Sequence, residues 1–305
     1  MIRTPLSRLL GGLHVELGRG DHRDSVFLAG SGRSGTTWLS EIINHGGGYR
    51  YVFEPFNPGK VGAFGHFNSK QYLRPDDGRE EFLEPVRRAL TGALRDPWTD
   101  RFNKRIFARR RLIKDIRANL LLAWMRANFP GMPIVLLLRH PCAVVASRLD
   151  LGWKDNLDET MDQEELVEDF LLPVEGEIRA AGDDFERHLF LWCIDNYVPL
   201  KQFGREGIHL TFYENLLVNP EQELQSLFDV LGEDLDGNVF DRLRRPSPLS
   251  RRDAPVPSVD GWRARVGARR LQRTGEILNL FGLDRVYGEG SMPDPSGARA
   301  LMERE

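Results

Sequence analysis

The sequence predicts an α/β protein of three layers, in which a parallel sheet carries helices on both of its faces. Short apolar runs of strand length alternate along the chain with longer stretches of helical periodicity. A glycine-rich segment also joins the first apolar run directly to a helix. Strands that alternate with helices pair in parallel, because each crossover helix returns the chain to the end of the sheet where the previous strand began. Such sheets bind ligands at the carboxyl ends of their strands, so we expect a binding crevice there.

The expected elements follow one another in a regular order. Apolar runs predict strands at residues 26–30, 111–116, 134–139 and 208–213, and residues 49–56 are expected to be extended. Helices are predicted at residues 36–45, 79–95, 119–129, 142–151, 184–203, 221–231 and 268–281. Pro141 and Pro220 stand at helix starts, where the fixed φ of proline suits the first turn. Residues 244–257 are rich in Pro, Ser and Arg and are expected to form a loop.

A single domain is expected over residues 1–305. The chain of 305 residues is 41% hydrophobic, which is enough to build one large core. Residues 1–23 are expected to form an N-terminal extension, and the polar, aromatic-rich residues 57–105 an insertion on the substrate side. Cys142 and Cys193 are too few for a disulfide framework or a cysteine zinc site, so both are expected to be free and packed.

Residues 30–39, with the sequence GSGRSGTTWL, form the most informative segment, which we call the glycine loop. Between a strand and a helix, glycines allow positive φ, backbone N–H groups face an anion, and the helix N-terminus adds positive charge. The segment therefore predicts a phosphate cradle. A nucleoside-triphosphate P-loop carries a lysine after its last glycine, whereas here Thr36 stands there and Arg33 is the nearest cation. Such a loop suits Mg-ATP poorly and suits a terminal group of lower charge.

The glycine loop resembles the phosphosulfate loop of the sulfotransferases that use 3′-phosphoadenosine 5′-phosphosulfate (PAPS). The resemblance lies in residues 32–39, GRSGTTWL. It implies that the 5′-phosphosulfate is bound by Arg33, Ser34, Gly35, Thr36 and Thr37. The family's tryptophan stacks on adenine, which implies the same for Trp38, and the alternative is that Trp38 packs the first helix against the core.

A second segment supports this resemblance. Arg139 ends a buried apolar run, and Ser147 lies eight residues later in the next helix. Arginine grips phosphate through two charge-assisted hydrogen bonds, and a hydroxyl adds another donor. The family binds the 3′-phosphate with an arginine and a serine at this spacing, so the resemblance implies that role for Arg139 and Ser147. Taken alone, an arginine after a strand is more often a solvated charge.

The resemblance also implies two further nucleotide contacts. Residues 213–216, YENL, followed by Asn-Pro, resemble a family segment that lies beside the adenine. Tyr213 is thus a candidate base contact, and the alternative is an aromatic residue that closes the sheet edge. The family brings a basic C-terminal loop over the 3′-phosphate. Arg263 is the candidate for that role, although the family's longer Arg-Lys-Gly signature is absent.

Glu54 is the candidate general base. Animal cytosolic sulfotransferases place a histidine two residues after a lysine on the strand that matches residues 112–116, but here the pair is Lys114 and Ile116. Residues 53–55, Phe-Glu-Pro, instead resemble an element of carbohydrate 6-O-sulfotransferases. An apolar frame is expected to raise the pKa of Glu54. Lys114 is a candidate contact to the sulfuryl group, or a strand-end charge paired with Asp115.

Two histidines are reserve candidates for the base. They are His66 and His45, and the second is more easily explained as a capping residue at the end of the first helix. A glutamate before proline in a loop is also commonly a solvated carboxylate, so this alternative to the base role of Glu54 stays open.

The resemblance implies a sulfotransferase that moves a sulfuryl group from PAPS to a hydroxyl, or less often an amine, of a carbohydrate or small-molecule acceptor. The product is 3′-phosphoadenosine 5′-phosphate (PAP). No metal is expected, because PAPS has no γ-phosphate for Mg²⁺ to bridge. Two alternatives remain: a nucleotide kinase or NTPase with a degenerate P-loop, and a nucleotide-binding module without catalysis. Acceptor identity and oligomeric state stay open.

Composition narrows the partners. The formal net charge of −3 argues against nucleic acid, and the arginine-rich residues 101–111 fit an anionic acceptor or a solvated face. The acidic residues 155–168 are expected to be solvated rather than to bind a metal. No apolar run is long enough to cross a membrane, and residues 1–23 lack a secretory core, so the protein is expected to be cytoplasmic without a membrane span.

Overall fold

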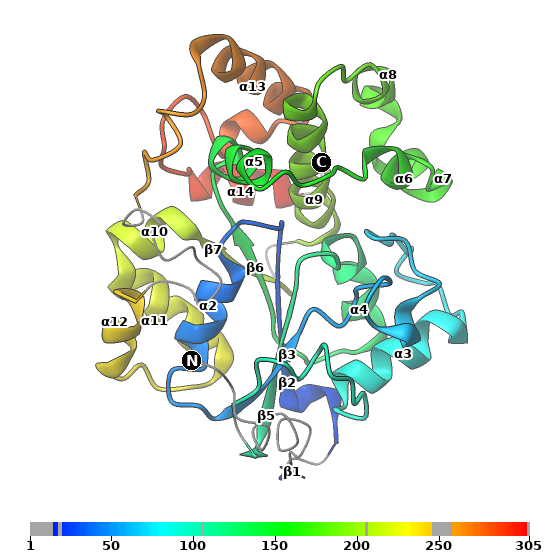
Figure 1. Ribbon diagram of the computed structural model, residues 1–305, viewed down its shortest axis with the longest axis vertical. Coiled ribbons are helices and arrows are strands. Elements are labelled where there is room, and N and C mark those ends of the chain that lie inside the picture. Colours follow the sequence, from blue (N-terminus) through cyan, green and yellow to red (C-terminus); the bar gives the residue numbers. More distant parts are fainter. Residues whose placement is uncertain (1–14, 18–19, 105, 205–206, 246–257, 304–305) are drawn as a thin grey trace.

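A parallel sheet of five strands forms the centre of the protein (Figure 1). The computed structural model describes residues 15–17, 20–104, 106–204, 207–245 and 258–303. Across the sheet, the strands are β3 (Tyr49–Phe53), β5 (Arg110–Asp115), β2 (Ser25–Gly30), β6 (Ile134–Leu138) and β7 (His209–Phe212). A separate parallel pair joins β1 (Val15–Glu16) to β4 (Phe107–Ala108). The predicted parallel α/β fold is confirmed.

Two apolar clusters lie on opposite faces of this sheet. Along β2, Val26 and Leu28 belong to one cluster, whereas Phe27 and Ala29 belong to the other. Successive side chains of a strand point to opposite faces, so this alternation means that both faces are covered. The sequence shows an unbroken apolar run here because neither face meets water.

Helices cover both faces. Beside the cluster that contains Val26 lie α2 (Thr36–Ile43), α10 (Tyr213–Val218), α11 (Pro220–Leu231) and α12 (Asn238–Leu243) (Figure 1). The other cluster draws on α3 (Glu80–Leu90), α4 (Leu122–Asn128), α5 (Pro141–Asp150), α9 (Asp184–Gln202), α13 (Ala268–Leu280) and α14 (Pro295–Met302). Short helices occupy Leu157–Met161 (α6), Glu164–Leu166 (α7) and Glu175–Arg179 (α8). None of the helices in the described part of the chain has the length and apolarity to cross a bilayer.

The boundaries differ from the expected ones at three places. The helix expected at residues 79–95 ends at Leu90, and the one expected from residue 119 begins as a 3-10 turn before α4. Tyr213 starts α10 instead of ending β7. Helices α12 and α14 were not expected, since each spans too few residues for its periodicity to stand out. The loop expected at residues 244–257 lies largely outside the described residues, as does most of the 1–23 extension.

Three arginines of residues 101–111, namely Arg101, Arg110 and Arg111, contact other parts of the fold, whereas Arg109 is exposed as a solvated face requires. The Arg101 guanidinium lies 3.8 Å from the ring centre of Trp98. Arg111 is fully buried and donates to the Ser25 hydroxyl at 2.8 Å. Arg110 pairs with Glu233 at 3.0 Å. Cys142 and Cys193 are free and buried, as expected.

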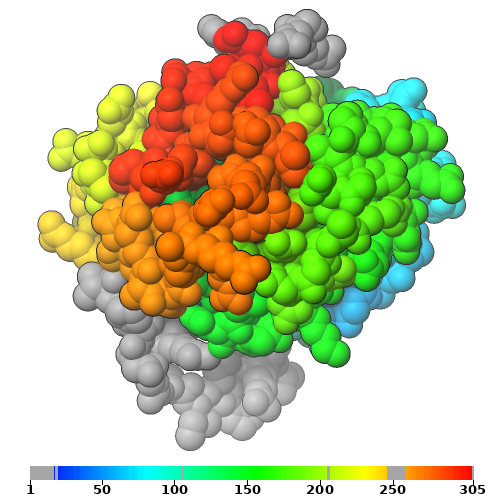
Figure 2. All heavy atoms as spheres, turned by 90° about the horizontal axis from the view of Figure 1, so that it is seen from above, coloured from blue at the N-terminus to red at the C-terminus, as the bar shows by residue number. Residues whose placement is uncertain are grey.

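The C-terminal segment, residues 258–303, packs over the end of the sheet where the strands finish. Figure 2 views this end and shows the segment, orange to red, beside the green helices. Trp262 stacks on His140 with ring centres 4.3 Å apart, and Tyr287 meets the edge of the same imidazole. His140 also caps α5 by accepting from the Cys142 N–H at 3.2 Å. This buried histidine therefore joins the C-terminal segment to the turn after β6.

His140 is expected to make the protein less stable in acid. Burial lowers the pKa of His140 to about 4, whereas in the unfolded chain it stays near 6.5. Below pH 6.5 the unfolded chain takes up a proton that the folded protein refuses, so stability falls as the pH drops toward 4. The loss is about 1.4 kcal/mol per pH unit in this window. Urea unfolding of the wild type and of His140→Asn at pH 7 and pH 5 measures it. Asparagine keeps a capping acceptor but does not titrate. The free energy of unfolding should therefore fall by about 2 kcal/mol less between pH 7 and pH 5 in the variant than in the wild type. An equal fall in both proteins would show that His140 is not the group responsible.

Candidate active site

The glycine loop leaves β2 at the carboxyl edge of the sheet and leads into α2. Arg33 has a φ of 79° and Gly35 a φ of 103°, and the Ser34 N–H donates to the Ser31 carbonyl at 2.9 Å. These left-handed residues turn the backbone around the N-terminus of α2, where free N–H groups and the helix dipole attract anions. Glycine is required at position 35 for two reasons. Its φ is positive, and a methyl group there would lie 2.7 Å from the Tyr213 ring.

Arg139 and Ser147 both lie beside this loop. The Arg33 Nε donates to the Ser147 hydroxyl at 3.0 Å, and an Arg139 terminal nitrogen donates to the Arg33 carbonyl at 3.1 Å. The buried Nε of Arg139 and the buried hydroxyl of Ser34 have no hydrogen-bond partner among the described residues. Unpartnered buried donors are costly, and an anion would satisfy them. The structure thus brings together Arg33, Arg139 and Ser147, three of the predicted site residues.

Two aromatic rings complete this side of the cluster. Tyr213 lies with its ring centre 4.0 Å from the Arg139 guanidinium and 5.2 Å from the ring of Trp38. Both rings are buried against the face of the sheet that α2 covers. Trp38 thus packs the first helix against the core, and the described residues offer its indole N–H no acceptor. Tyr213 positions Arg139 through a cation–π contact.

A buried network that the sequence did not reveal holds the backbone at Arg139. Trp192 of α9 donates to the Arg139 carbonyl at 3.1 Å. Glu214 accepts from the His140 N–H at 2.9 Å and from the Tyr287 hydroxyl at 2.9 Å. Burial raises the pKa of Glu214. Glu214 follows Tyr213 in the motif already noted, so the only signal for it was its place in that segment.

Glu54 lies at the same edge of the sheet, after β3. It binds the Lys114 ammonium at 2.6 Å and the Arg117 guanidinium at 2.9 Å. Its φ is 44°, held by a hydrogen bond from its N–H to the Lys114 carbonyl at 2.8 Å and by one from Trp98 to its own carbonyl at 3.2 Å. Among the described residues, Glu54 and Arg33 are the two non-glycine residues with positive φ. Such strain gathers at functional sites.

The expected rise in the pKa of Glu54 is wrong. Burial acts to raise this pKa, but the charges and hydrogen bonds of Lys114 and Arg117 outweigh it and hold the pKa below the usual range. Lys114 pairs with Glu54 rather than with its neighbour Asp115. Asp115 instead accepts from the Phe56 N–H at 2.8 Å, and burial raises its pKa to about 6. Arg117 was not expected at the site, because nothing in its local sequence distinguishes it from a surface arginine.

Three of the remaining candidates are engaged elsewhere. The Arg263 side chain donates to Asp260 at 3.0 Å and to the Glu289 carbonyl at 2.9 Å. His45 caps α2, with its Nδ1 3.0 Å from the Ile42 carbonyl. His66 is exposed and lies 3.0 Å from the Glu81 carbonyl of α3. Each of these contacts is with a residue outside the glycine loop and outside the Glu54 group.

The site combines a lysine-free anion cradle, a paired arginine and serine, and an ionised carboxylate on adjacent parallel strands. Within the described residues, no group of three or more His, Cys, Asp or Glu side chains could hold a metal ion. This arrangement offers hydrogen-bond donors and positive charge to an anionic group at the carboxyl end of the sheet. The model of the sulfotransferase domain family matches residues 23–250, and the chain belongs to this family of transferases. No curated protein is a significant match.

Several sulfotransferases of known structure are similar to this chain at low sequence identity. The sulfotransferase domain of an olefin synthase from Synechococcus PCC 7002 is 15% identical, with a TM-score of 0.47 over 84% of this chain and 94% of that one. A sulfotransferase from Alicyclobacillus acidocaldarius is 14% identical, with a TM-score of 0.44 over 90% and 98%. A mouse sulfotransferase complexed with PAP is 12% identical, with a TM-score of 0.47 over 96% and 92%.

Proposed function

We propose that this sulfotransferase transfers the sulfuryl group of PAPS to a hydroxyl of its acceptor, with Glu54 as the general base. The proposal rests on one observation: Arg33 contacts both Arg139 and Ser147 beside the N-terminus of α2. A nucleotide that carries phosphate on both the 3′ and the 5′ oxygen of its ribose would bring one anionic group to each of these two neighbouring arginines.

The donor is assigned to two anion subsites. The 5′-phosphosulfate lies over the glycine loop, where Arg33 and the N–H groups of Gly35, Thr36 and Thr37 surround it and the Ser34 hydroxyl adds a donor. The 3′-phosphate binds Arg139 and Ser147. The adenine lies near Tyr213, with Trp38 behind it. Arg263 reaches the 3′-phosphate only by exchanging its contact with Asp260, which an exposed ion pair permits at little cost.

The chemistry requires a base and a means of neutralising charge. Glu54 takes the proton of the acceptor hydroxyl as the acceptor oxygen bonds to sulfur and the bond from sulfur to the 5′-phosphate oxygen breaks. The leaving phosphate keeps the electron pair of that bond. Lys114, held 2.6 Å from Glu54, is placed to offset negative charge on the sulfuryl oxygens. The lowered pKa keeps Glu54 ionised at neutral pH, so it enters the reaction as a carboxylate.

The acceptor side is assigned to residues 57–105, the predicted insertion within a single domain. Ser69 and Lys70 of this segment lie beside the glycine loop residue Gly32, in the wall of one cavity. A hydroxyl of a carbohydrate or small metabolite is the proposed acceptor, and the cytoplasm the proposed location.

Incubation with PAPS and a panel of hydroxyl acceptors tests the proposal. We expect PAP to form together with one sulfated acceptor, at a rate that EDTA leaves unchanged, because no step needs a divalent cation to bridge phosphates. Turnover of ATP that EDTA abolishes would instead indicate the P-loop kinase or NTPase. Binding of PAP without any transfer would leave only a nucleotide-binding module.

A further inference from the structure

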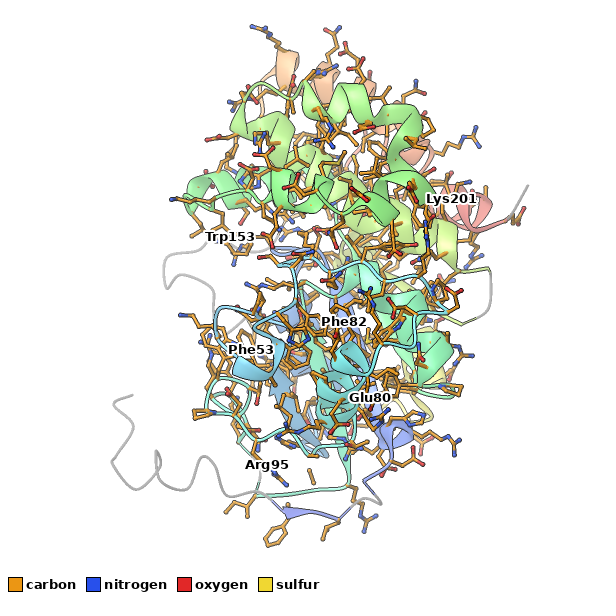
Figure 3. The ribbon with its side chains drawn as sticks, turned by 90° about the vertical axis from the view of Figure 1, so that its right-hand side faces the viewer. Phe53, Glu80, Phe82, Arg95, Trp153 and Lys201 are labelled. Carbon is orange, nitrogen blue, oxygen red and sulfur yellow. The ribbon has the colours of Figure 1, made fainter. Side chains whose placement is uncertain are left out.

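A cavity of about 190 Å³ lies beside the glycine loop. Gly32 of the loop forms part of its wall, and so does Arg117, the partner of Glu54. The indole of Trp153 covers Gly32 so closely that a methyl group on Gly32 would lie 2.7 Å from the ring. Figure 3 labels Trp153 where the helical end of the molecule meets the sheet. The cavity therefore adjoins both the donor loop and the proposed base.

The walls of this cavity are strongly basic. They carry four cationic side chains, from Lys70, Arg117, Arg148 and Lys154. His188 lines it as well, and its buried Nδ1 has no partner among the described residues. None of the described residues that line the cavity is Asp or Glu. A neutral, apolar acceptor gains nothing from such a wall, whereas an anion is attracted by its positive charges.

The carboxylate behind one wall is shared by two of these cations. Asp195 is fully buried; it binds the Lys70 ammonium, accepts from the Ser31 hydroxyl at 2.6 Å and lies 3.7 Å from a terminal nitrogen of Arg148. One negative charge thus faces two positive ones. Burial lowers the pKa of Lys70, which Asp195 only partly offsets. Two cations therefore share the single negative charge of Asp195.

Arg117 brings a second ion-paired group to the wall of the cavity. Glu54 lies between Lys114 and Arg117, at 2.6 Å and 2.9 Å, and Asp115 accepts from the Arg117 N–H at 2.8 Å. Lys154, at the mouth, is exposed and forms no ion pair with another described residue. An excess of buried positive charge is costly unless an anion compensates it. The proposed donor accounts for Arg33 and Arg139, whereas Lys70, Arg148 and Lys154 line this cavity.

We propose that the acceptor carries an anionic oxygen group, a carboxylate or a phosphate or sulfate ester, and that this cavity binds it. The inference rests on the proposed function, because it places the acceptor hydroxyl toward Glu54 while the anionic group lies between Lys70, Arg148 and Lys154. The volume is below the about 300 Å³ at which ordinary ligand pockets begin. The cavity therefore holds the anionic end of an acceptor rather than the whole of a large one.

Calorimetry on PAP-loaded protein tests this with matched pairs of compounds. The pairs are hydroxybenzoate against its methyl ester, glucuronate against glucose, and glycerol phosphate against glycerol. At least one anionic member is expected to bind at least about tenfold more tightly than its neutral partner. The first two pairs report on carboxylates and the third on phosphate esters. Equal affinity within every pair would overturn the proposal, and so would competition between the anionic compounds and PAP, since they would then occupy the donor site.

Lys154 offers a variant that leaves the buried groups intact. Lys154→Gln is expected to reduce the preference for the anionic member about threefold to fivefold, and Lys154→Arg to keep it. The control is Lys201→Gln on α9, which Figure 3 shows on the other side of the molecule and which should change nothing. A preference that Lys154→Gln leaves intact would overturn the assignment of the anion to this cavity.

Failure of the proposed function has a different signature. If PAP does not bind, the donor assignment is wrong whatever the matched pairs show. The same pairs titrated into unloaded protein then decide whether the cavity binds anions. If PAP binds but the two members of every pair bind with equal affinity, the proposed function is kept and the proposal of an anionic acceptor is wrong.

Discussion

Replacing Arg139 with alanine is expected to weaken the binding of PAP about 100-fold while leaving the binding of 5′-AMP nearly unchanged. The substitution removes a charge-assisted, bidentate contact to the 3′-phosphate, worth about 3 kcal/mol in a partly buried site. AMP lacks that phosphate and so loses nothing. Titration calorimetry of both nucleotides on both proteins isolates the effect of the 3′-phosphate, because any general damage to the site would weaken AMP as well.

Two variants control this experiment. Arg139→Lys keeps a positive charge but loses the bidentate geometry, so its affinity for PAP should lie between those of the wild type and the alanine variant. Arg126→Ala removes an exposed arginine from α4, on the other face of the sheet, and should leave both affinities unchanged. Parallel losses of PAP and AMP in Arg139→Ala would mean that Arg139 supports the loop and does not bind the 3′-phosphate.

Replacing Glu54 with glutamine is expected to lower kcat by about 10² to 10⁴, the usual contribution of a general base, without a matching loss of PAP affinity. Glutamine keeps an oxygen for Lys114 but cannot take a proton. Because the pKa of Glu54 is held below its usual range, the wild-type rate should stay level as the pH falls to about 5, since the carboxylate remains ionised. Single-turnover kinetics across pH 4 to 8 measure both effects.

PAP affinity and stability separate the base from an ion-pair role. If Glu54 only held Lys114 and Arg117 in place, the loss of kcat in Glu54→Gln would come with a loss of PAP affinity and of thermal stability. A loss of kcat without those losses supports the base. A variant that turns over like the wild type rules Glu54 out as the base.

The residues that meet around the glycine loop could be found from the sequence because local patterns mark them. The glycine loop, Arg139 at a strand end and Ser147 in the following helix each follow a strand, and parallel strands bring their carboxyl ends to one edge. The five-strand register then places Gly30 beside Leu137 and Phe53 beside Lys114. No knowledge of distant contacts was needed to place these groups near one another.

The acceptor side and the support of the site were not predictable in this way. Arg117 meets Glu54 only because β3 and β5 are neighbours, and Lys70 meets Asp195 across a separation of 125 residues. Such contacts also reverse the shift expected for the pKa of Glu54, since the effect of burial is outweighed by Lys114 on β5 and Arg117 just after it. Glu214 and Trp192 fix Arg139 through tertiary hydrogen bonds that leave no periodic signal.

The most direct test of the central claim is the affinity of the wild-type protein for PAP, 5′-AMP and Mg-ATP, measured by calorimetry under one set of conditions. The account predicts that PAP binds most tightly, about 100-fold more so than AMP, and that EDTA does not change its affinity. A preference for Mg-ATP that disappears with EDTA would contradict the account and indicate a nucleoside-triphosphate site.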